Sequence, residues 1–163
     1  MRTLRCFTLH YFLAFICLMA APSLAQSVWF EVGWAYDETA ELEFASGAKL
    51  GVRGVYPLNR SLGLYLSPYL ITGLGGPDLV GGVDAGIWYD FRSTPQDLEG
   101  FSSYAGVGLT LIKAQFGAVI SGAFSYEVAR NTELALIFNY RPLIIPDFSQ
   151  AFDVSLGVKY DLD

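Results

Sequence analysis

The chain has 163 residues, a formal net charge of −6 and a mean hydropathy of +0.38, and 53% of its residues are hydrophobic. This length suffices for one domain and leaves little for a second. Acidic residues outnumber basic ones by sixteen to ten, and such a surface is unsuited to nucleic acid.

The first 25 residues are predicted to be a cleaved signal peptide. Arg2 and Arg5 precede an apolar run over 11–21, and residues 23–25 supply small side chains where a signal peptidase reads them. An uncleaved membrane anchor is the alternative, but the run is shorter than the roughly 20 residues that a spanning helix needs. Residues 26–163 would then form the mature domain.

Both cysteines, Cys6 and Cys17, and the only histidine, His10, lie in this leader. A lipoprotein site at Cys17 is disfavoured because Phe15 and Ile16 stand where a small residue is needed. The mature chain would carry sixteen acidic and eight basic residues, a net charge of −8. Without a histidine base the usual hydrolytic constellations are excluded, so we expect no catalytic residues, no metal and no cofactor.

Eight later stretches alternate apolar and polar residues with the two-residue period of a β-strand. The alternation is clearest in the last stretch, where apolar residues occupy every second position from Phe152 to Leu162 and Asp153, Lys159 and Asp161 lie between them. In chain order the predicted strands cover residues 27–37, 41–56, 62–72, 79–91, 101–112, 114–128, 133–141 and 151–162.

The segments between these stretches carry turn residues. We expect turns at 57–61, near Lys113 and at 129–132, loops at 73–78 and 142–150, and a longer polar connection over 92–100. Pro68 does not fit its strand because proline cannot donate to the ladder, so we expect a bulge or an early strand end there.

The distribution of charge between the two faces decides the class of barrel. The apolar face carries no charged residue in any stretch. An eight-stranded barrel leaves just enough room inside for side chains, so the small and polar face must point inward and the apolar face toward lipid. The opposite face carries Glu31, Lys49, Arg53, Asp84, Asp90, Glu127, Glu133, Arg141, Asp153, Lys159 and Asp161.

Aromatic residues near the strand ends support the same conclusion, because transmembrane barrels carry aromatic girdles at both interfaces. Only helices and closed sheets satisfy every backbone group in lipid. The sequence therefore predicts an all-β fold, an eight-stranded antiparallel up-and-down transmembrane β-barrel. The outward aromatics are Tyr36, Tyr56, Tyr89, Phe91, Phe101, Tyr126, Tyr140, Phe152 and Tyr160.

In this architecture the segment 27–162 resembles the small eight-stranded outer-membrane proteins of the OmpA membrane-domain and OmpX kind. The resemblance implies a place in the outer membrane, contact with its lipid and assembly by the barrel-insertion machinery. Such proteins often end in an aromatic residue with another apolar residue two before it. This chain keeps that spacing with Tyr160 and Leu162, but Leu replaces the aromatic and Asp163 follows.

Two sets of charged residues are candidate sites. Glu31, Arg53, Asp84 and Lys159 are predicted to form the middle of a salt-bridge network in the lumen, with Lys159 near Glu31 if the first and last strands close the barrel. Acid–base work by the Glu31 and Asp84 carboxylates is the alternative, but buried charges are normally paired.

The second set is a possible cation site at the outer rim. The alternative is that these residues form a solvated acidic loop that binds no cation. The members of this set are Asp37, Glu38, Glu41 and Glu43. The segment 142–148 is apolar for a loop, and we expect it to pack over the barrel mouth or at the lipid interface, with partner docking as the alternative.

These features predict a non-enzymatic, exported outer-membrane barrel with a structural or surface-interaction role. A narrow pore for small solutes is the second hypothesis, which the polar lumen permits and its width disfavours. A soluble lipocalin-like ligand-binding barrel is the third, and it requires polar outward faces.

Overall fold

The computed structural model describes residues 26–38, 44–73, 79–91, 100–112, 115–145 and 148–162. The predicted signal peptide, the predicted turn near Lys113 and most of the predicted loops at 73–78 and 92–100 lie outside these residues. The strands are β1 (Ser27–Glu38), β2 (Phe44–Pro57), β3 (Leu62–Gly73), β4 (Leu79–Asp90), β5 (Phe101–Ile112), β6 (Gln115–Ala129), β7 (Thr132–Ile145) and β8 (Ser149–Asp161).

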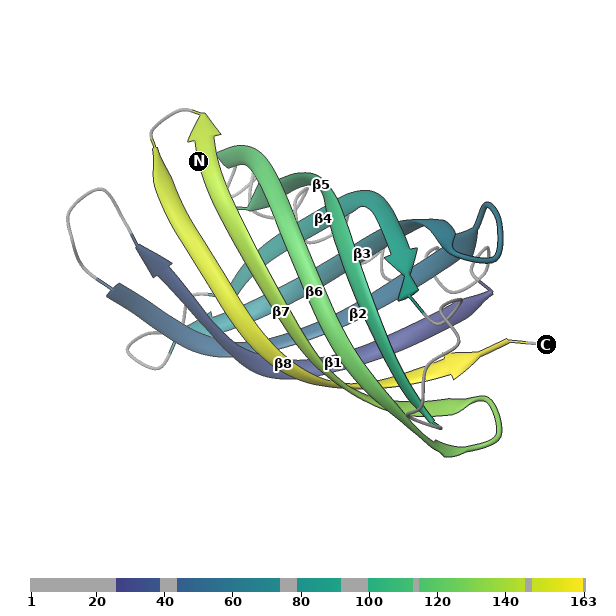
Figure 1. Ribbon diagram of the computed structural model, residues 1–163. Coiled ribbons are helices and arrows are strands. Elements are labelled where there is room, and N and C mark those ends of the chain that lie inside the picture. Colours follow the sequence, from purple (N-terminus) through teal and green to yellow (C-terminus); the bar gives the residue numbers. More distant parts are fainter. Residues whose placement is uncertain are drawn as a thin grey trace, which may run out of the picture.

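The strands form a closed antiparallel barrel in sequence order, and β1 completes it by pairing with β8. Figure 1 shows them tilted and wound around the barrel axis. Pairing of neighbours in sequence is up-and-down topology, in which closure leaves no free sheet edge. The predicted fold is confirmed, and each predicted strand coincides with an observed one within four residues at either end.

Side chains alternate between a buried inner face and an exposed outer face. On β8, Asp153 is 0% exposed and Leu156 is 64% exposed. All nine predicted girdle aromatics are exposed on the outer face. The predicted direction of the two faces is therefore confirmed, and a lipocalin-like barrel with a polar exterior is not what this chain forms.

Pro68 neither ends β3 nor forms a bulge, so that prediction was wrong. The β2–β3 ladder is interrupted between the pairs Gly51–Tyr69 and Gly54–Leu66 and resumes in the same register. On its other side, Pro68 stays paired with Val83 of β4. A proline removes only its own donated bond, and the pairing with β4 keeps the strand in place.

The predicted loop at 142–150 was also too long, because β7 runs on through Pro142 to Ile145 and β8 begins at Ser149. Leu143 points into the lumen and is fully buried, whereas Ile144, Ile145 and Phe148 are exposed on the outside. The strand alternation therefore continues as far as Ile144. Pro146 and Asp147 lie outside the described residues.

Two turns match the prediction at the terminal end of the barrel, which is the end where β1 begins and β8 ends. Asn59 Oδ1 accepts hydrogen bonds from the backbone N–H of Ser61 and of Leu62, both at 2.9 Å. Asn131 adopts a positive φ of 62° between β6 and β7, a conformation that asparagine tolerates in turns.

The interior is layered along the barrel axis. Near the ends of β5 and β7, Tyr69, Ile112 and Leu143 form an apolar layer. Toward the terminal end lies a larger cluster that includes Trp29, Tyr65, Trp88 and Tyr104. Charged residues lie between the two layers, at the middle of the lumen.

Large aromatic rings also point into the lumen, at positions that the two-residue alternation assigns to the inner face. Glycines on neighbouring strands make the room for two of them. Gly82 pairs with Tyr69, and a Cβ at Gly82 would meet the Tyr69 ring. Gly106 pairs with Trp88, and a Cβ there would meet the indole.

Candidate functional site in the barrel lumen

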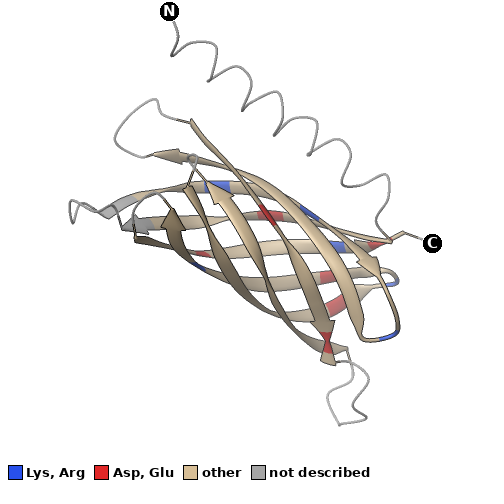
Figure 2. Cartoon of the chain, turned by 90° about the horizontal axis from the view of Figure 1, so that it is seen from above, with Lys and Arg blue, Asp and Glu red and all other residues tan. Residues whose placement is uncertain are grey.

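Charged residues occur as isolated positions along otherwise uncharged strands (Figure 2). Inside the barrel they meet in a central cluster, which comprises the six side chains Glu31, Lys49, Arg53, Asp84, Arg141 and Asp153. These residues come from β1, β2, β4, β7 and β8. Barrel closure therefore brings together residues that are far apart in the sequence.

Glu31 lies between two cations of β2. Its Oε1 is 3.0 Å from Arg53 Nε, and its Oε2 is 3.0 Å from Lys49 Nζ. The Lys49 ammonium also lies 2.7 Å from Asp153 Oδ1 on β8. Lys49 thus links the carboxylates of the first and last strands.

Arg141 joins the other two carboxylates. Its Nη2 donates to Asp84 Oδ2 at 2.7 Å, and its Nε lies 3.1 Å from both Asp84 oxygens. Its Nη1 pairs with Asp153. Thr110 Oγ1 donates a further hydrogen bond to Asp84 Oδ1 at 2.6 Å. This forked, charge-assisted arrangement is among the strongest that side chains make.

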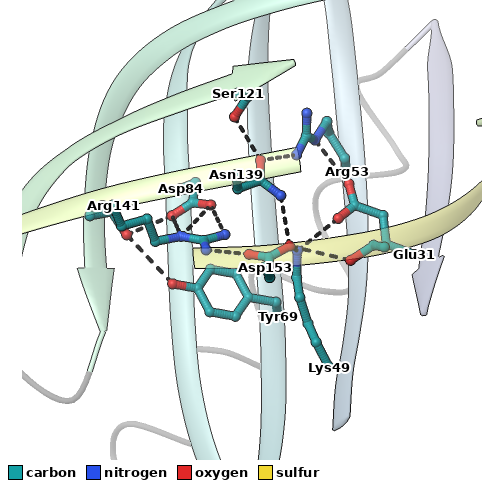
Figure 3. Close-up of polar contacts among 11 residues, drawn as sticks. Glu31, Lys49, Arg53, Tyr69, Asp84, Ser121, Asn139, Arg141 and Asp153 are labelled. Carbon is teal, nitrogen blue, oxygen red and sulfur yellow. Dashed lines mark hydrogen bonds and ion pairs between the residues drawn. The ribbon is translucent and has the colours of Figure 1, made fainter. Parts of the chain in front are cut away.

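Asn139 connects the parts of the cluster without adding charge (Figure 3). Its Oδ1 accepts from Arg53 Nη2 at 3.0 Å and from Ser121 Oγ at 2.7 Å. Its Nδ2 donates to Asp153 Oδ1 at 2.8 Å. One amide therefore satisfies groups on both sides of the lumen.

The central cluster is electrically balanced. Its three cations and three carboxylates each expose at most 1% of their side chain. Removing a charge from water is expensive unless a partner and hydrogen bonds compensate for it, and here every member has at least one ion-pair partner. Equal numbers of opposite charges keep the barrel centre neutral.

Aromatic faces complete the surroundings of the cations. Arg141 Cζ lies 4.6 Å from the centroid of the Tyr69 ring, and Arg53 Cζ lies 4.6 Å from that of Trp88. Such cation–π contacts are strongest where water is excluded. The charged centre is therefore closed by rings on either side along the axis.

Lys159 belongs to a separate terminal cluster, which comprises Lys159, Glu133, Asp161, Tyr104 and Ser125. The ammonium lies 3.0 Å from Glu133 Oε1 and 3.1 Å from Asp161 Oδ1. Tyr104 and Ser125 both donate to Glu133 Oε2. Lys159 is paired across the ladder with Trp29 and Glu31 with Gly157.

Of the four residues proposed for the lumen network, the structure brings Glu31, Arg53 and Asp84 into the central cluster and places Lys159 in the terminal cluster instead of beside Glu31. The selected set lacked Lys49, Arg141 and Asp153, which supply half of the central cluster. Their charged side chains on the inner face were the available signal, but cross-lumen partners depend on the register, which the sequence does not reveal.

The possible rim cation site lies outside what can be described. Glu41 and Glu43 fall outside the described residues, and only the backbone of Asp37 and Glu38, at the end of β1, is placed. Within the described part of the chain, no group of three or more His, Cys, Asp and Glu side chains could hold a metal ion. Glu31 and Asp84, the candidate acid–base pair, are each engaged with a cation.

A closed eight-stranded barrel with an apolar exterior and a packed, charge-balanced interior defines a transmembrane β-barrel. Among the described residues, no helix is long and apolar enough to cross a membrane.

Three solved outer-membrane barrels have a similar fold. Neisserial surface protein A, NspA, is 18% identical and matches 83% of this chain and 96% of its own with a TM-score of 0.70. The N-terminal barrel domain of OprF from Pseudomonas aeruginosa is 15% identical, with a TM-score of 0.57 and coverage of 83% and 98%. Ail, the attachment invasion locus protein of Yersinia pestis, is 14% identical, with a TM-score of 0.51 and coverage of 83% and 99%.

No family model matches the chain. No curated protein matches it either. At these sequence identities, the likeness to NspA, OprF and Ail shows a shared fold and nothing more.

Proposed function

We propose that this chain is an integral outer-membrane β-barrel protein with a non-enzymatic role, either structural or in surface interaction. The observation that carries the proposal is the combination of an exterior covered by exposed apolar side chains with a lumen filled by buried, mutually paired charges. Lipid is the solvent that accepts such an exterior.

The orientation follows from the connections. Gln26 and Leu162, which flank the barrel strands, lie at one end of the barrel together with the turns after β2 and β6, and in this proposal that end faces the periplasm. The leader over 1–25 would direct export and be removed, and the barrel-insertion machinery would assemble residues 26–163 in the outer membrane.

A non-enzymatic role is supported by the residues available. His10, Cys6 and Cys17 all lie in the proposed leader. The buried carboxylates of Glu31, Asp84 and Asp153 are held in ion pairs, an arrangement that suits stabilising the barrel better than moving protons.

The narrow pore is disfavoured because the lumen is blocked at its middle. Trp29, Arg53, Tyr69, Lys49 and Arg141 are all at most 1% exposed, so ions have no open path past them. The folded protein in planar bilayers should show no conductance steps. Discrete steps that persist in a preparation free of other barrels would favour the pore.

The experiment that tests the proposal is gel mobility of the outer-membrane fraction with and without boiling. A folded barrel of this type resists detergent and shifts on heating. A heat-modifiable band in that fraction is the expected result. A soluble periplasmic band with no shift would overturn the membrane assignment.

A further inference from the structure

The structure contains a pocket of about 270 Å³ at the terminal end of the barrel, where β1 begins and β8 ends. The turn that contains Asn59 and Arg60, together with Asp90 and Asp161, contributes to its wall. Trp29, Trp88 and Tyr104 form its floor and are almost fully buried. The pocket is separate from the central cluster, which lies deeper along the axis.

Two donors in the floor have no protein partner. The indole N–H groups of Trp29 and Trp88 are buried without a hydrogen-bond partner among the described residues. A buried tryptophan N–H usually finds an acceptor. Both residues line the same pocket, but the two N–H atoms have almost no accessible surface, so a ligand with acceptor oxygens reaches them only if the floor side chains shift on binding.

The charges of the wall exclude several kinds of ligand. Arg60 and Lys159 balance Asp90 and Asp161, so the lining has no net charge to favour an ion. A cationic ligand would also face Lys159, whose ammonium already lies 6.0 Å from the Trp29 ring centroid and 5.7 Å from that of Tyr104.

An anion is disfavoured for a related reason. Lys159 is already engaged by Glu133 and Asp161, and the two wall carboxylates would repel a second negative group. A purely apolar ligand would remove Asp90, Asp161 and Arg60 from water without replacing their hydrogen bonds, which is unfavourable.

We infer that the pocket binds a neutral, polyhydroxylated ligand, a single saccharide ring. Its hydroxyls donate to Asp90 and Asp161 and accept from Arg60, while its C–H groups lie over the small part of the floor that Trp88 and Tyr104 leave exposed. The volume agrees, because it lies below the roughly 300 Å³ at which pockets for drug-sized ligands begin.

Two sources share this chemistry, a free sugar and a sugar unit of the cell-wall glycan. The second source depends on the proposed function, which turns this end of the barrel toward the periplasm. Binding of a free sugar does not depend on that orientation.

The test uses tryptophan fluorescence of the refolded protein in detergent. Trp34 is the one tryptophan on the outer face, so Trp34→Phe leaves only Trp29 and Trp88, both in the pocket floor. Addition of N-acetylglucosamine or glucose should give a saturable change with a midpoint of about 1 to 30 mM. Erythritol, an open-chain polyol, should give none.

Two arginine substitutions test whether the ligand binds in this pocket. Arg60→Gln should weaken binding about three- to tenfold, the effect of one lost hydrogen bond. Arg130→Gln removes an exposed arginine from the turn after β6, outside the pocket lining, and should leave the midpoint unchanged. Equal effects of the two changes would contradict the assignment.

A second arm separates the two sources. Co-sedimentation with insoluble peptidoglycan, reduced by Arg60→Gln, without a response to the free sugars would identify the wall glycan as the ligand. If neither probe binds, or if only inorganic phosphate gives a saturable response, the inference is overturned. A heat-modifiable band from the same sample shows that the barrel is folded, so a failed inference is distinguished from a failed proposed function.

Discussion

Arg141 is the residue on which two carboxylates of the lumen depend. Its guanidinium contacts Asp84 through Nε and Nη2 and Asp153 through Nη1. Asp153 keeps Lys49 as a second ion-pair partner, whereas Arg141 is the ion-pair partner through which Asp84 joins the central cluster. Among the described residues, loss of this guanidinium therefore leaves the buried Asp84 carboxylate without an ion-pair partner and with Thr110 as its neutral donor.

Arg141→Met should destabilise the barrel by about 3 to 5 kcal/mol, because removal of one partner from a buried ion pair leaves an uncompensated charge. Unfolding in urea, followed by loss of the heat-shifted band, measures the change. The double variant Arg141→Met with Asp84→Asn should recover part of the loss. No recovery would show that the guanidinium acts through packing rather than through its charge.

Lys159→Met provides the comparison within the same lumen. Its main partner Glu133 is buried, but the Asp161 side chain is 39% exposed and lies beside the terminal pocket. Solvent weakens ion pairs and hydrates the carboxylates that lose their partner. We expect a smaller loss than for Arg141→Met by the same assay, and a larger one would contradict this ranking.

The difference between these two residues also marks the limit of the sequence prediction. Both were assigned correctly to the inner face, because a two-residue period suffices for that assignment. Lys159 was expected beside Glu31 across the closing strands, but its long side chain reaches Glu133 and Asp161 instead. The length of the side chain and the register of β7 against β8 determine such partners, and the alternation of residues along one strand predicts neither.

At the scale of strands, β4 and β5 approach each other closely at a pair of glycines. Gly86 of β4 is the ladder partner of Gly108 of β5. A Cβ at Gly108 would meet the Ala85 backbone oxygen and the Gly86 Cα. Because the obstruction is backbone, no rotamer change can relieve it.

Gly108→Ala should therefore destabilise the barrel by about 1 to 3 kcal/mol, in the range of overpacking effects. Gly122→Ala on β6 is the matched control, because a Cβ there would meet only Tyr104 O at 3.9 Å. Urea midpoints of the two variants give the comparison. Equal midpoints would show that the strands can separate enough to admit the methyl group.

The prolines show where strand prediction failed. Pro68 was expected to interrupt β3 because proline removes a ladder donor, and Pro142 was expected to begin a loop. In a closed barrel each strand is held by two neighbours, so the remaining bonds keep a proline within the strand. The alternation that places Leu143 inside and Ile144 outside continues through this region.

At the scale of the whole molecule, the two ends of the lumen differ. The end at which β5 ends and β6 begins is filled by Tyr69, Ile112 and Leu143, whereas the terminal end opens into a pocket. The neutral, charged centre separates the two. The sequence predicted a barrel with a charged interior, but not this order of layers. The order depends on the register between neighbouring strands, which sets the inward-facing residues that lie at the same depth in the lumen.

The membrane environment itself can be tested by two substitutions on one strand. Val107 lies near the middle of β5 and Phe101 at its beginning, both on the outer face. Their exposed fractions are nearly equal, 60% and 56%, so burial within the protein does not distinguish them.

In a bilayer, an arginine costs about 2 to 4 kcal/mol at the midplane and about 0 to 1 kcal/mol near the interface. Folding into phospholipid vesicles from urea should therefore be impaired by Val107→Arg and little changed by Phe101→Arg. A soluble barrel would tolerate an exposed arginine at both positions, so equal, small effects would contradict the membrane assignment.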